Sequence, residues 1–304
     1  MHPRNKHTGR YDFEELTKNV PELVPFVTLN PSQERTIDFA DPMAVKTLNR
    51  AILKTYYGVD HWGIPAGYLC PPVPGRADYI HHAADLLGSS NGGTIPRGDS
   101  VRILDVGVGA NCIYPIIGRA EYGWRFVGSE TDPVALACAQ KIIDANASLS
   151  QGVKLREQTG SLILQGLLKP EERFDLTLCN PPFNNSLEEA QAGAKRKWEN
   201  LNRPDTGKNF GGQAAELCTP GGEAAFASRL ISESAALGTQ VYWFSTLISK
   251  SANLESVMKA LGRAKAADTR TIEMSQGQKK SRVVAWTFLN KKQREEWRQR
   301  RWAK

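Results

Sequence analysis

The sequence predicts an α/β protein in which helices cover both faces of a mostly parallel β-sheet, preceded by an N-terminal helical module. From residue 101 onward, short apolar runs alternate with helical segments, an order typical of a parallel sheet. Two of these runs end in turns rich in glycine or proline, at the edge where open α/β sheets bind ligands. A chain of 304 residues with 40% hydrophobic content has room for about two domains and a substantial core.

The first ninety residues are predicted to be mainly helical. Asp41 and Pro42 form a typical helix start, with aspartate as N-cap and proline at the first helical position. Apolar residues then recur at helical spacing through residues 44–54. A connector rich in proline and glycine, residues 71–75, leads into a second helix over residues 76–87.

A segment rich in Gly, Ser and Pro, residues 89–99, is the predicted domain boundary. It divides the chain into an N-terminal, mainly helical module (1–95), a sheet domain (96–290) and a basic C-terminal tail (291–304).

The sheet domain contains seven apolar runs that are predicted as strands. Several of them are separated by helical segments, which implies right-handed crossovers between parallel strands. The predicted strands are residues 101–106, 125–130, 153–157, 174–179, 240–245, 266–272 and 282–289, and the predicted helices between them are 134–145, 223–236 and 252–262.

The fourth run ends in Asn180-Pro181-Pro182-Phe183. Neither proline can donate to a sheet ladder, and each restricts the residue before it to an extended conformation. The two prolines therefore make a stiff corner at the carboxyl end of a buried strand. This corner has asparagine on its inner side and an aromatic ring on its outer side.

Such a corner suits transfer of a group to an amine on a planar conjugated ring. The lone pair of that amine is delocalised, so acceptors that hold its two N–H bonds favour the reactive geometry. The side-chain oxygen of Asn180 and the carbonyl of Pro181 are the candidate acceptors. Phe183 would stack on the base, a contact worth roughly 1–3 kcal/mol in single-stranded nucleic-acid sites. The alternative is a proline-rich structural turn in which Phe183 only packs.

A glycine turn follows the first predicted strand, with the pattern Asp105-x-Gly107-x-Gly109. These glycines allow a ligand to approach the backbone closely at a helix N-terminus. The dinucleotide fingerprint requires a third glycine where this chain has Cys112, which argues against NAD or FAD. Glu130 closes the second strand, where a carboxylate can bind ribose hydroxyls. A purely structural turn is the alternative when the pattern is considered alone.

The net charge of +7 is concentrated at the ends of the chain. Residues 291–304 carry seven basic against two acidic side chains, a net +5, and the first ten residues add Arg4, Lys6 and Arg10 without an acid. Basic ends on a nearly neutral middle suggest a polyanionic partner. A solvated tail without a partner is the alternative.

A basic segment, Lys195-Arg196-Lys197, lies beside the proline corner in a long stretch rich in glycine and asparagine. Long loops without structure of their own are often functional. A basic loop bearing an aromatic residue suits single-stranded RNA, because charge follows the phosphates and rings stack on bases. The alternative is a helix over residues 186–200 whose basic face is merely solvated.

Other composition signals indicate a cytoplasmic protein without a metal. The five cysteines are scattered and contain no Cys-x-x-Cys pair, which predicts reduced thiols. His81 and His82 are adjacent and would point to different faces of a helix. No run approaches the roughly 18 apolar residues of a membrane span, and the polar N-terminus lacks the apolar core of a secretory signal.

Taken together, these motifs resemble the class I S-adenosylmethionine-dependent methyltransferases. More narrowly, the chain resembles the ribosomal large subunit 23S RNA adenine-N6-methyltransferase F family and the related methyltransferase-like sixteen proteins. The similarity extends over nearly the whole chain and is carried by the corner at residues 180–183 and by residues 2–5, 71–81, 104–115, 128–132, 209–213 and 276–279. The longer strings are specific, whereas Asn-Pro-Pro-Phe also occurs in DNA adenine and protein glutamine methyltransferases.

The resemblance implies a Rossmann-like class I fold with a mostly parallel seven-stranded sheet. S-adenosyl-L-methionine would be the cofactor, and Asn180, Pro181, Pro182 and Phe183 would form the catalytic corner. Arg76 would hold the carboxylate of the cofactor, the N-terminal module (1–95) would bind RNA, and residues 96–290 would form the methyltransferase domain. The implied cofactor-binding residues are Arg76, Asp105, Gly107, Gly109, Asn111, Glu130 and Thr131, and the implied RNA-binding residues are Arg4, Lys6, Arg10, Lys195, Arg196, Lys197 and Lys279.

The predicted function is therefore methylation of the exocyclic N6 amine of one adenine in 23S rRNA, by a monomer. The substrate would be the naked rRNA or a large-subunit assembly intermediate. One alternative is a DNA adenine or protein glutamine methyltransferase with the same corner. A methyltransferase-like fold that only binds RNA in ribosome assembly is another, although an intact Asn180–Phe183 corner argues against it.

Overall fold

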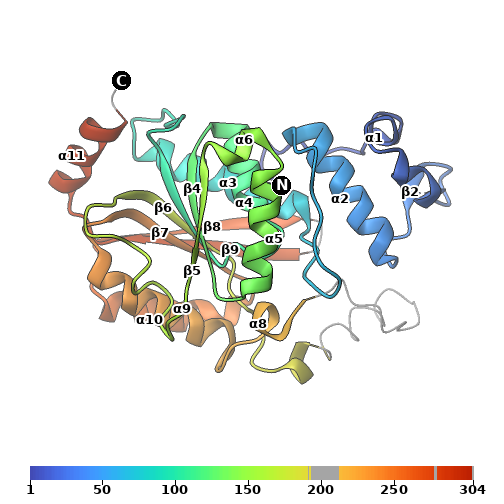
Figure 1. Cartoon of the computed structure of the whole chain (residues 1–304). Helices are drawn as coiled ribbons and strands as arrows, with labels where there is room; N and C mark the ends of the chain where they lie inside the picture. Colours follow the sequence, from blue (N-terminus) through green and yellow to red (C-terminus); the bar gives the residue numbers. More distant parts are fainter. Residues whose placement is uncertain (191, 193–211, 277–278, 303–304) are drawn as a thin grey trace.

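The computed structural model describes residues 1–190, 192, 212–276 and 279–302, and its centre is a seven-stranded sheet (Figure 1). The strands stand in the order β5 (Val153–Glu157), β4 (Arg125–Glu130), β3 (Arg102–Val106), β6 (Phe174–Cys179), β7 (Val241–Ile248), β9 (Lys279–Thr287) and β8 (Asp268–Gln276). The first five are parallel, whereas β9 is antiparallel to both of its neighbours. The predicted α/β fold with a mostly parallel seven-stranded sheet is confirmed.

The N-terminal region contains the two predicted helices and further short elements. The first helix is α2 (Pro42–Tyr57), which Asp41 caps by accepting from the Met43 amide at 2.8 Å. The second is α3 (Val73–Ser89), which begins three residues before its predicted start. The elements that periodicity did not predict are α1 (Phe13–Asn19), η1 (Pro21–Phe26) and the hairpin of β1 (Val27–Leu29) and β2 (Arg35–Ile37).

Helices cover both faces of the sheet, and neighbouring strand residues alternate between two apolar cores. Ile103 and Phe126 pack with the helices α3, α4 (Ile113–Tyr122) and α5 (Pro133–Asp144). Leu104 and Val127 pack with α9 (Gly222–Ser234) and α10 (Leu254–Arg263) on the opposite face (Figure 1). The short connecting elements are α6 (Ala147–Ser150), α8 (Ala214–Leu217), η2 (Ala235–Leu237) and η3 (Ser251–Asn253).

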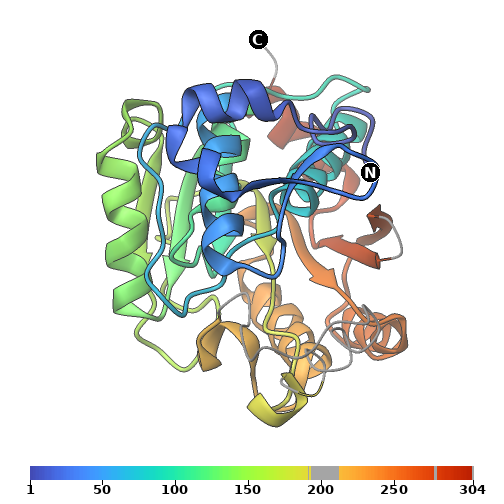
Figure 2. The same cartoon turned by 90° about the vertical axis from the view of Figure 1, so that its right-hand side faces the viewer.

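The N-terminal module shares its core with one face of the sheet. Leu16 of α1, Ile52 of α2 and Ile80 of α3 belong to the same apolar cluster as Ile103 of β3. Figure 2 views the molecule from the side of this module. One core joins residues 1–95, 96–290 and 291–304. The division of the chain into three regions with separate roles therefore stays a prediction. Within the described ranges, the model contains no helix that is both long and apolar enough to cross a membrane.

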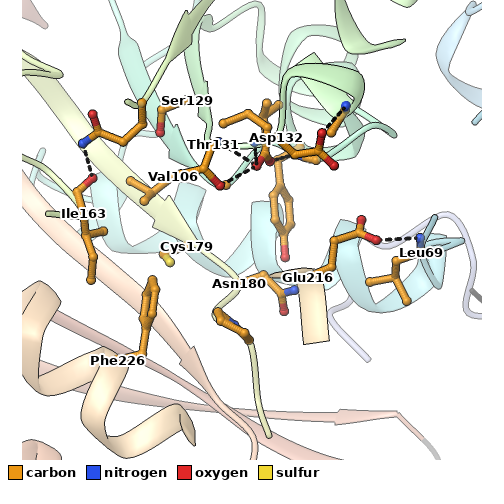
Figure 3. A pocket seen from close by; sticks show the side chains of 18 of the residues that line it. Leu69, Val106, Ser129, Thr131, Asp132, Ile163, Cys179, Asn180, Glu216 and Phe226 are labelled. Carbon is orange, nitrogen blue, oxygen red and sulfur yellow. Dashed lines mark hydrogen bonds between the residues drawn. The ribbon is translucent and has the colours of Figure 1, made fainter. Parts of the chain in front are cut away.

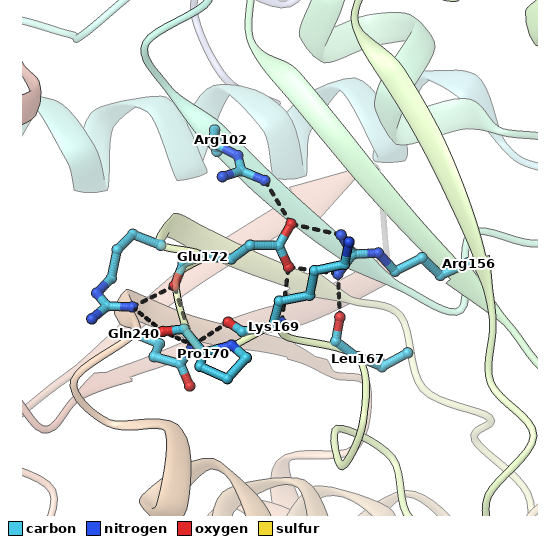
Figure 4. A network of polar contacts seen from close by, with 8 residues as sticks. Arg102, Arg156, Leu167, Lys169, Pro170, Glu172 and Gln240 are labelled. Atoms are coloured by element: carbon cyan, nitrogen blue, oxygen red, sulfur yellow. Dashed lines mark hydrogen bonds and ion pairs between the residues drawn. The ribbon is translucent and has the colours of Figure 1, made fainter.

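A buried carboxylate, Glu172, links the segment before β6 to two neighbouring strands (Figure 4). It accepts hydrogen bonds from Arg156 at 2.6 and 2.7 Å, from Arg102 at 3.0 Å and from the Lys169 amide at 3.0 Å. The hydrogen bond with Arg156 is the main reason why the pKa of Glu172 falls to about 2. This network holds the segment that leads into β6 against the first residue of β3 and against Arg156, near the end of β5.

Residues 291–304 were expected to be a basic tail, but most of them form a packed helix, α11 (Lys291–Arg301). Its anchor is the fully buried Asp175 of β6. The Asp175 carboxylate accepts from the indole N–H of Trp297 at 2.7 Å and of Trp302 at 2.9 Å, and from Arg301 at 2.7 and 2.9 Å. Lys291, Lys292 and Arg300 remain exposed on the outside. The segment is thus structural on one side and cationic on the other.

We expect Asp175→Ala to destabilise the protein strongly. Two buried indole N–H groups and the Arg301 guanidinium would lose their acceptor, and breaking such a buried charged cluster costs roughly 3–5 kcal/mol. Urea unfolding should therefore show a much lower midpoint. Lys292→Ala, on the exposed side of the same helix, should change the free energy of unfolding by less than about 0.5 kcal/mol. Equal midpoints for the two variants would show that α11 is not anchored through Asp175.

Candidate functional site

The glycine turn, the acid after the second strand and the proline corner meet at one edge of the sheet. Val106 of β3 is paired with Ser129 of β4 on one side and with Cys179 of β6 on the other. Gly107, Glu130 and Asn180 each directly follow one of these three paired residues. Glu130 is also the last residue of β4. All three line a pocket of about 270 Å³ (Figure 3).

The glycine turn folds over the end of β4. Gly107 and Gly109 have positive φ values of 78° and 63°, which a residue with a side chain adopts only with strain. The amides of Gly107 and Val108 both donate to the Ser129 carbonyl, at 3.0 and 2.9 Å. This geometry leaves the backbone of the turn facing the pocket.

Glu130 joins the glycine turn to the start of α5. Its carboxylate accepts from the Gly109 amide at 2.9 Å, from the Thr131 amide at 2.8 Å and from the Asp132 amide at 3.1 Å. Asp132 is the N-cap of α5 and accepts from the Tyr68 hydroxyl at 2.6 Å. The Glu130 carboxylate is thus held rigidly at the pocket wall, where Thr131 also lies.

Asn111 shapes the entry to α4. Its side-chain oxygen accepts from the Ile113 amide at 3.1 Å, and its backbone carbonyl accepts from the Trp62 indole at 2.9 Å. The next residue, Cys112, has a φ of 53°, a left-handed conformation that is uncommon for a residue with a Cβ. Asn111 lines the pocket, whereas the strained N-cap Cys112 is buried beside it at the start of α4.

Asp105 precedes the pocket-lining residue Val106, but it is completely buried and is not itself part of the lining. Both oxygens of its carboxyl lack a hydrogen-bond partner in the described structure. Burial, together with the nearby charge of Glu130, raises the pKa of Asp105 to about 8, while Arg76 acts in the opposite direction. A buried polar group without partners is unusual, and it suggests a ligand group as the missing partner.

Asn180 and Arg76 meet inside the pocket. One guanidinium nitrogen of Arg76, Nη1, donates to the Asn180 Oδ1 atom at 3.1 Å. Arg76 lies in α3, whose neighbouring residues Ala77 and Tyr79 are buried, and its guanidinium carbon is 5.8 Å from the centre of the Tyr114 ring. The proline corner and the N-terminal module are therefore in direct contact.

Buried hydrogen bonds support the strand that leads to this corner. The Tyr79 hydroxyl is 2.8 Å from the Ser245 hydroxyl and accepts weakly from the Cys179 amide at 3.4 Å. Ser245 in turn donates to the Thr177 carbonyl at 2.6 Å. These contacts fix the end of β6 between α3 and β7.

The residues of the proline corner take different positions. Asn180 and Pro182 line the pocket, whereas Pro181 is buried beside it and Phe183 is half-buried outside its lining. The segment after Phe183 is held by Asn184, whose amide donates to the Leu217 carbonyl at 3.0 Å. The assignment of Phe183 as a stacking residue stays a prediction.

The pocket contains a carboxylate that sequence reasoning missed, Glu216 of α8. It accepts from the Leu69 amide at 3.1 Å and from the Gln213 amide at 2.8 Å. Gly212 also donates to the Gly67 carbonyl at 2.8 Å. These bonds close a clasp, residues 67–69 with residues 212–216, across one side of the pocket. In the two bonds that cross between these segments, Gly212 to Gly67 and Leu69 to Glu216, the partners are 145 and 147 residues apart, so local patterns carry no signal for them.

Three of the predicted RNA-binding residues have partners within the protein. Arg4 pairs with Asp85 at 2.6 Å and also donates to the Tyr122 hydroxyl at 3.1 Å. Lys6 pairs with Glu121 at 2.7 Å, and the well-exposed Arg10 pairs with Glu34. Their role in RNA binding stays a prediction.

The other predicted RNA-binding residues lie after the proline corner and at the start of β9. Lys195, Arg196 and Lys197 lie outside the described residues. Lys279 begins β9, where its backbone pairs with Gln276. Among the side chains that the structure describes, no group of three or more His, Cys, Asp or Glu residues is arranged to hold a metal ion.

Comparisons with known proteins agree with this geometry. A family model described as RNA methyltransferase matches residues 1–290. The ribosomal RNA large subunit methyltransferase F of Pseudomonas paraeruginosa is 55% identical over 309 aligned positions, covering 100% of this chain and 92% of that protein. The protein of the same name from Pseudomonas fluorescens strain SBW25 is 56% identical, covering 99% of this chain and 90% of its own.

Solved structures extend the likeness to human METTL16. Its catalytic domain in complex with hairpin 1 of the MAT2A 3′UTR is 30% identical, with a TM-score of 0.82 and 96% of both chains covered. Its N-terminal domain in complex with SAH is 28% identical, with a TM-score of 0.75, covering 95% of this chain and 99% of that one.

The fold and the pocket define a class I, Rossmann-like methyltransferase, with its glycine turn and Asn-Pro-Pro-Phe corner at the carboxyl edge of one parallel sheet. The chain belongs to the RNA methyltransferase family whose model spans residues 1–290.

The raised pKa of Asp105 predicts an unusual dependence of stability on pH. The folded protein holds a proton up to about pH 8, whereas an unfolded aspartate with the ordinary pKa of 3.8 has already released it. The free energy of unfolding of the ligand-free protein should therefore fall between those two pH values and level off above them. Urea titrations at several pH values would measure this loss.

Asp105→Asn should remove this part of the pH dependence, because asparagine does not titrate. The free energy of unfolding of the variant minus that of the unmodified protein should be larger at pH 8 than at pH 5. Glu157→Gln, at an exposed position on the same sheet, serves as the control and should keep the original slope. An unchanged slope in Asp105→Asn would mean that the buried carboxyl is already ionised at pH 5.

Proposed function

We propose that this protein transfers a methyl group from S-adenosyl-L-methionine to the exocyclic N6 amine of one adenine in 23S rRNA. The observation that carries the proposal is that Asn180 and Pro182 line the same pocket as the glycine turn and Glu130. A cofactor site and an acceptor for a planar amine are thus adjacent. The names of the 55–56% identical relatives support large-subunit rRNA as the substrate.

The residues present fit this cofactor. Glu130 stands at the end of β4, where it would accept from ribose hydroxyls, and Thr131 and Asn111 complete that side of the wall. The unpartnered carboxyl of Asp105 beneath Gly107 and Gly109 fits the positively charged amino-acid end of the ligand. Arg76 is the guanidinium that would receive the carboxylate. The SAH complex of the METTL16 domain also supports this choice.

When bound, the cofactor supplies a methyl group on a cationic sulfonium, which needs alignment more than a strong base. The side-chain oxygen of Asn180 and the Pro181 carbonyl accept the two N–H bonds of the adenine amine and direct its lone pair toward the methyl. The rigid backbone of the proline corner keeps these acceptors in place. Phe183 stacks on the base outside the pocket lining, on the side from which a flipped nucleotide enters.

The RNA would be held by cations around the site. We propose Arg4, Lys6, Arg10, Lys195, Arg196, Lys197 and Lys279 for this role, together with the exposed Lys291, Lys292 and Arg300 of α11. The acting species would be a monomer, and its substrate the naked rRNA or a large-subunit assembly intermediate. The RNA complex of the METTL16 catalytic domain supports an RNA surface on this fold.

The function is tested by mapping N6-methyladenine in 23S rRNA from cells with and without the protein. One adenine should lose its methyl group when the protein is absent and regain it after incubation with the purified protein and cofactor. Free DNA and release-factor protein are assayed in parallel as substrates. Methylation of either one in place of rRNA would favour the alternative enzymes that share the corner.

Asn180→Ala should lower single-turnover methylation by about a hundredfold or more, the scale for removing one preorganised catalytic hydrogen-bonding group. Affinity for RNA should fall by no more than the loss of one hydrogen bond, because the phosphate contacts are untouched and the other partner of Asn180 is Arg76. Phe183→Ala should weaken both base capture and rate, since stacking precedes and accompanies transfer.

Asn185→Ala is the matched control, since Asn185 lies in the same segment and bonds to Gly221 outside the pocket. Melting curves must accompany each assay. Near-normal methylation by a folded Asn180→Ala protein would reduce the corner to a structural turn and place the active site elsewhere.

The proposed RNA surface predicts the salt dependence of binding. Replacing Lys195, Arg196 and Lys197 by alanine should reduce the slope of log affinity against log salt by up to about 0.7 per lost contact with a single strand. The triple replacement of Lys291, Lys292 and Arg300 should act similarly without disturbing the Asp175 anchor. Lys259→Ala in α10, exposed on the helix-covered face, is the control. A slope that no replacement changes would place RNA on another surface.

A further inference from the structure

We propose that Arg76 is a positioning residue that couples the cofactor to the adenine. In this proposal, Arg76 engages the acceptor oxygen of Asn180 until the cofactor carboxylate draws the guanidinium away. The adenine amine is then accepted more strongly in the loaded site than in the empty one. The inference rests on the proposed function and adds an order of events to it.

The geometry places one atom in two roles. The Asn180 Oδ1 atom, which must accept from the adenine amine, already accepts from Arg76 Nη1 at 3.1 Å. Guanidinium only donates hydrogen bonds, so this contact also fixes which end of the Asn180 amide faces Arg76. Both residues line the pocket, and they come from elements 104 residues apart, α3 and the end of β6.

The contact supports a correct amide orientation but opposes the reaction if it persists. As the adenine nitrogen takes up the methyl group, positive charge develops on that nitrogen. A permanently charged guanidinium on the same acceptor oxygen would repel it, and this repulsion is strong in a pocket that excludes water. Arg76 must therefore be neutralised or displaced before the amine reacts.

The ligand itself provides the group that can do this. A carboxylate is a stronger partner for arginine than a neutral amide oxygen, because it pairs in a bidentate, charge-assisted manner. The described surroundings of Arg76 do not already saturate it: the Asp105 carboxyl makes no hydrogen bond, and the Tyr114 ring lies 5.8 Å from the guanidinium carbon. Arrival of the amino-acid end of the cofactor thus frees Asn180 Oδ1 for the base.

This exchange makes the two binding events interdependent. A cofactor that bears the carboxylate should strengthen the amine-specific part of RNA binding, and by linkage the RNA should strengthen cofactor binding by the same factor. An analogue without the carboxylate should fill the nucleoside part of the pocket without this effect. The protein would then bind a flipped adenine more tightly when the cofactor is in place.

The test uses the full-length protein and a 23S rRNA fragment that contains the mapped adenine. A second fragment carries purine at that position and so lacks only the amine. The dissociation constant for the purine fragment is divided by that for the adenine fragment. This ratio isolates the contact with Asn180 from the phosphate contacts. It is measured without a ligand, with saturating S-adenosylhomocysteine, and with saturating 5′-methylthioadenosine, which lacks the amino-acid carboxylate.

S-adenosylhomocysteine should raise this ratio by about threefold to tenfold, the scale of one hydrogen bond. 5′-methylthioadenosine should leave it near its ligand-free value. In Arg76→Met the ratio should be high without any ligand and should not respond to either one. Unchanged affinity of Arg76→Met for 5′-methylthioadenosine would show that the pocket is intact.

Equal ratios with S-adenosylhomocysteine and 5′-methylthioadenosine in the unmodified protein would overturn the coupling, whatever the variant does. So would an Arg76→Met protein that still responds to S-adenosylhomocysteine. Either result would leave the proposed function standing if N6-methyladenine depends on the protein. Absence of that modification would instead refute the function.

Discussion

The site depends on the register of three parallel strands. Val106 stands opposite both Ser129 and Cys179, so the chain leaves β3, β4 and β6 at one level of the sheet. A shift of one residue in β6 would turn every side chain of that strand to the other face and carry Asn180 away from the glycine turn. The Glu172 network holds the segment that leads into β6 against Arg102 of β3, and the Tyr79–Ser245 contact secures the end of β6.

Local chemistry explains why much of this was predictable. The apolar runs, the glycine turn and the proline corner each lie within a few residues, and parallel topology brings their ends together without further information. Contacts between distant segments left no such signal. No local pattern indicates that Glu216 bonds to Leu69 or that Arg76 bonds to Asn180. In α11 the charges concealed the burial of Trp297 and Trp302, although two tryptophans in a basic segment were a sign of packing.

Charge is organised differently inside and outside the pocket. Glu130, Asp132 and Glu216 lie along its wall, as do the cations Arg76 and Arg229. Burial, assisted by the charges of Glu130 and Asp132, raises the pKa of Glu216. The pocket wall therefore carries charges of both signs. Many basic side chains gather instead at the two ends of the sequence, where they can face a polyanion without entering the pocket.

The partners of Asp175 in α11 are made late in synthesis of the chain. The indole groups that satisfy this buried carboxylate lie 122 and 127 residues further along the chain. At ordinary elongation rates, roughly 6 to 25 seconds separate β6 from those partners. Of the partners that Asp175 has in the folded structure, only the Arg102 amide has been made by the time β6 is made. The anchor at the start of β6 can therefore be completed only after nearly the whole chain has been made.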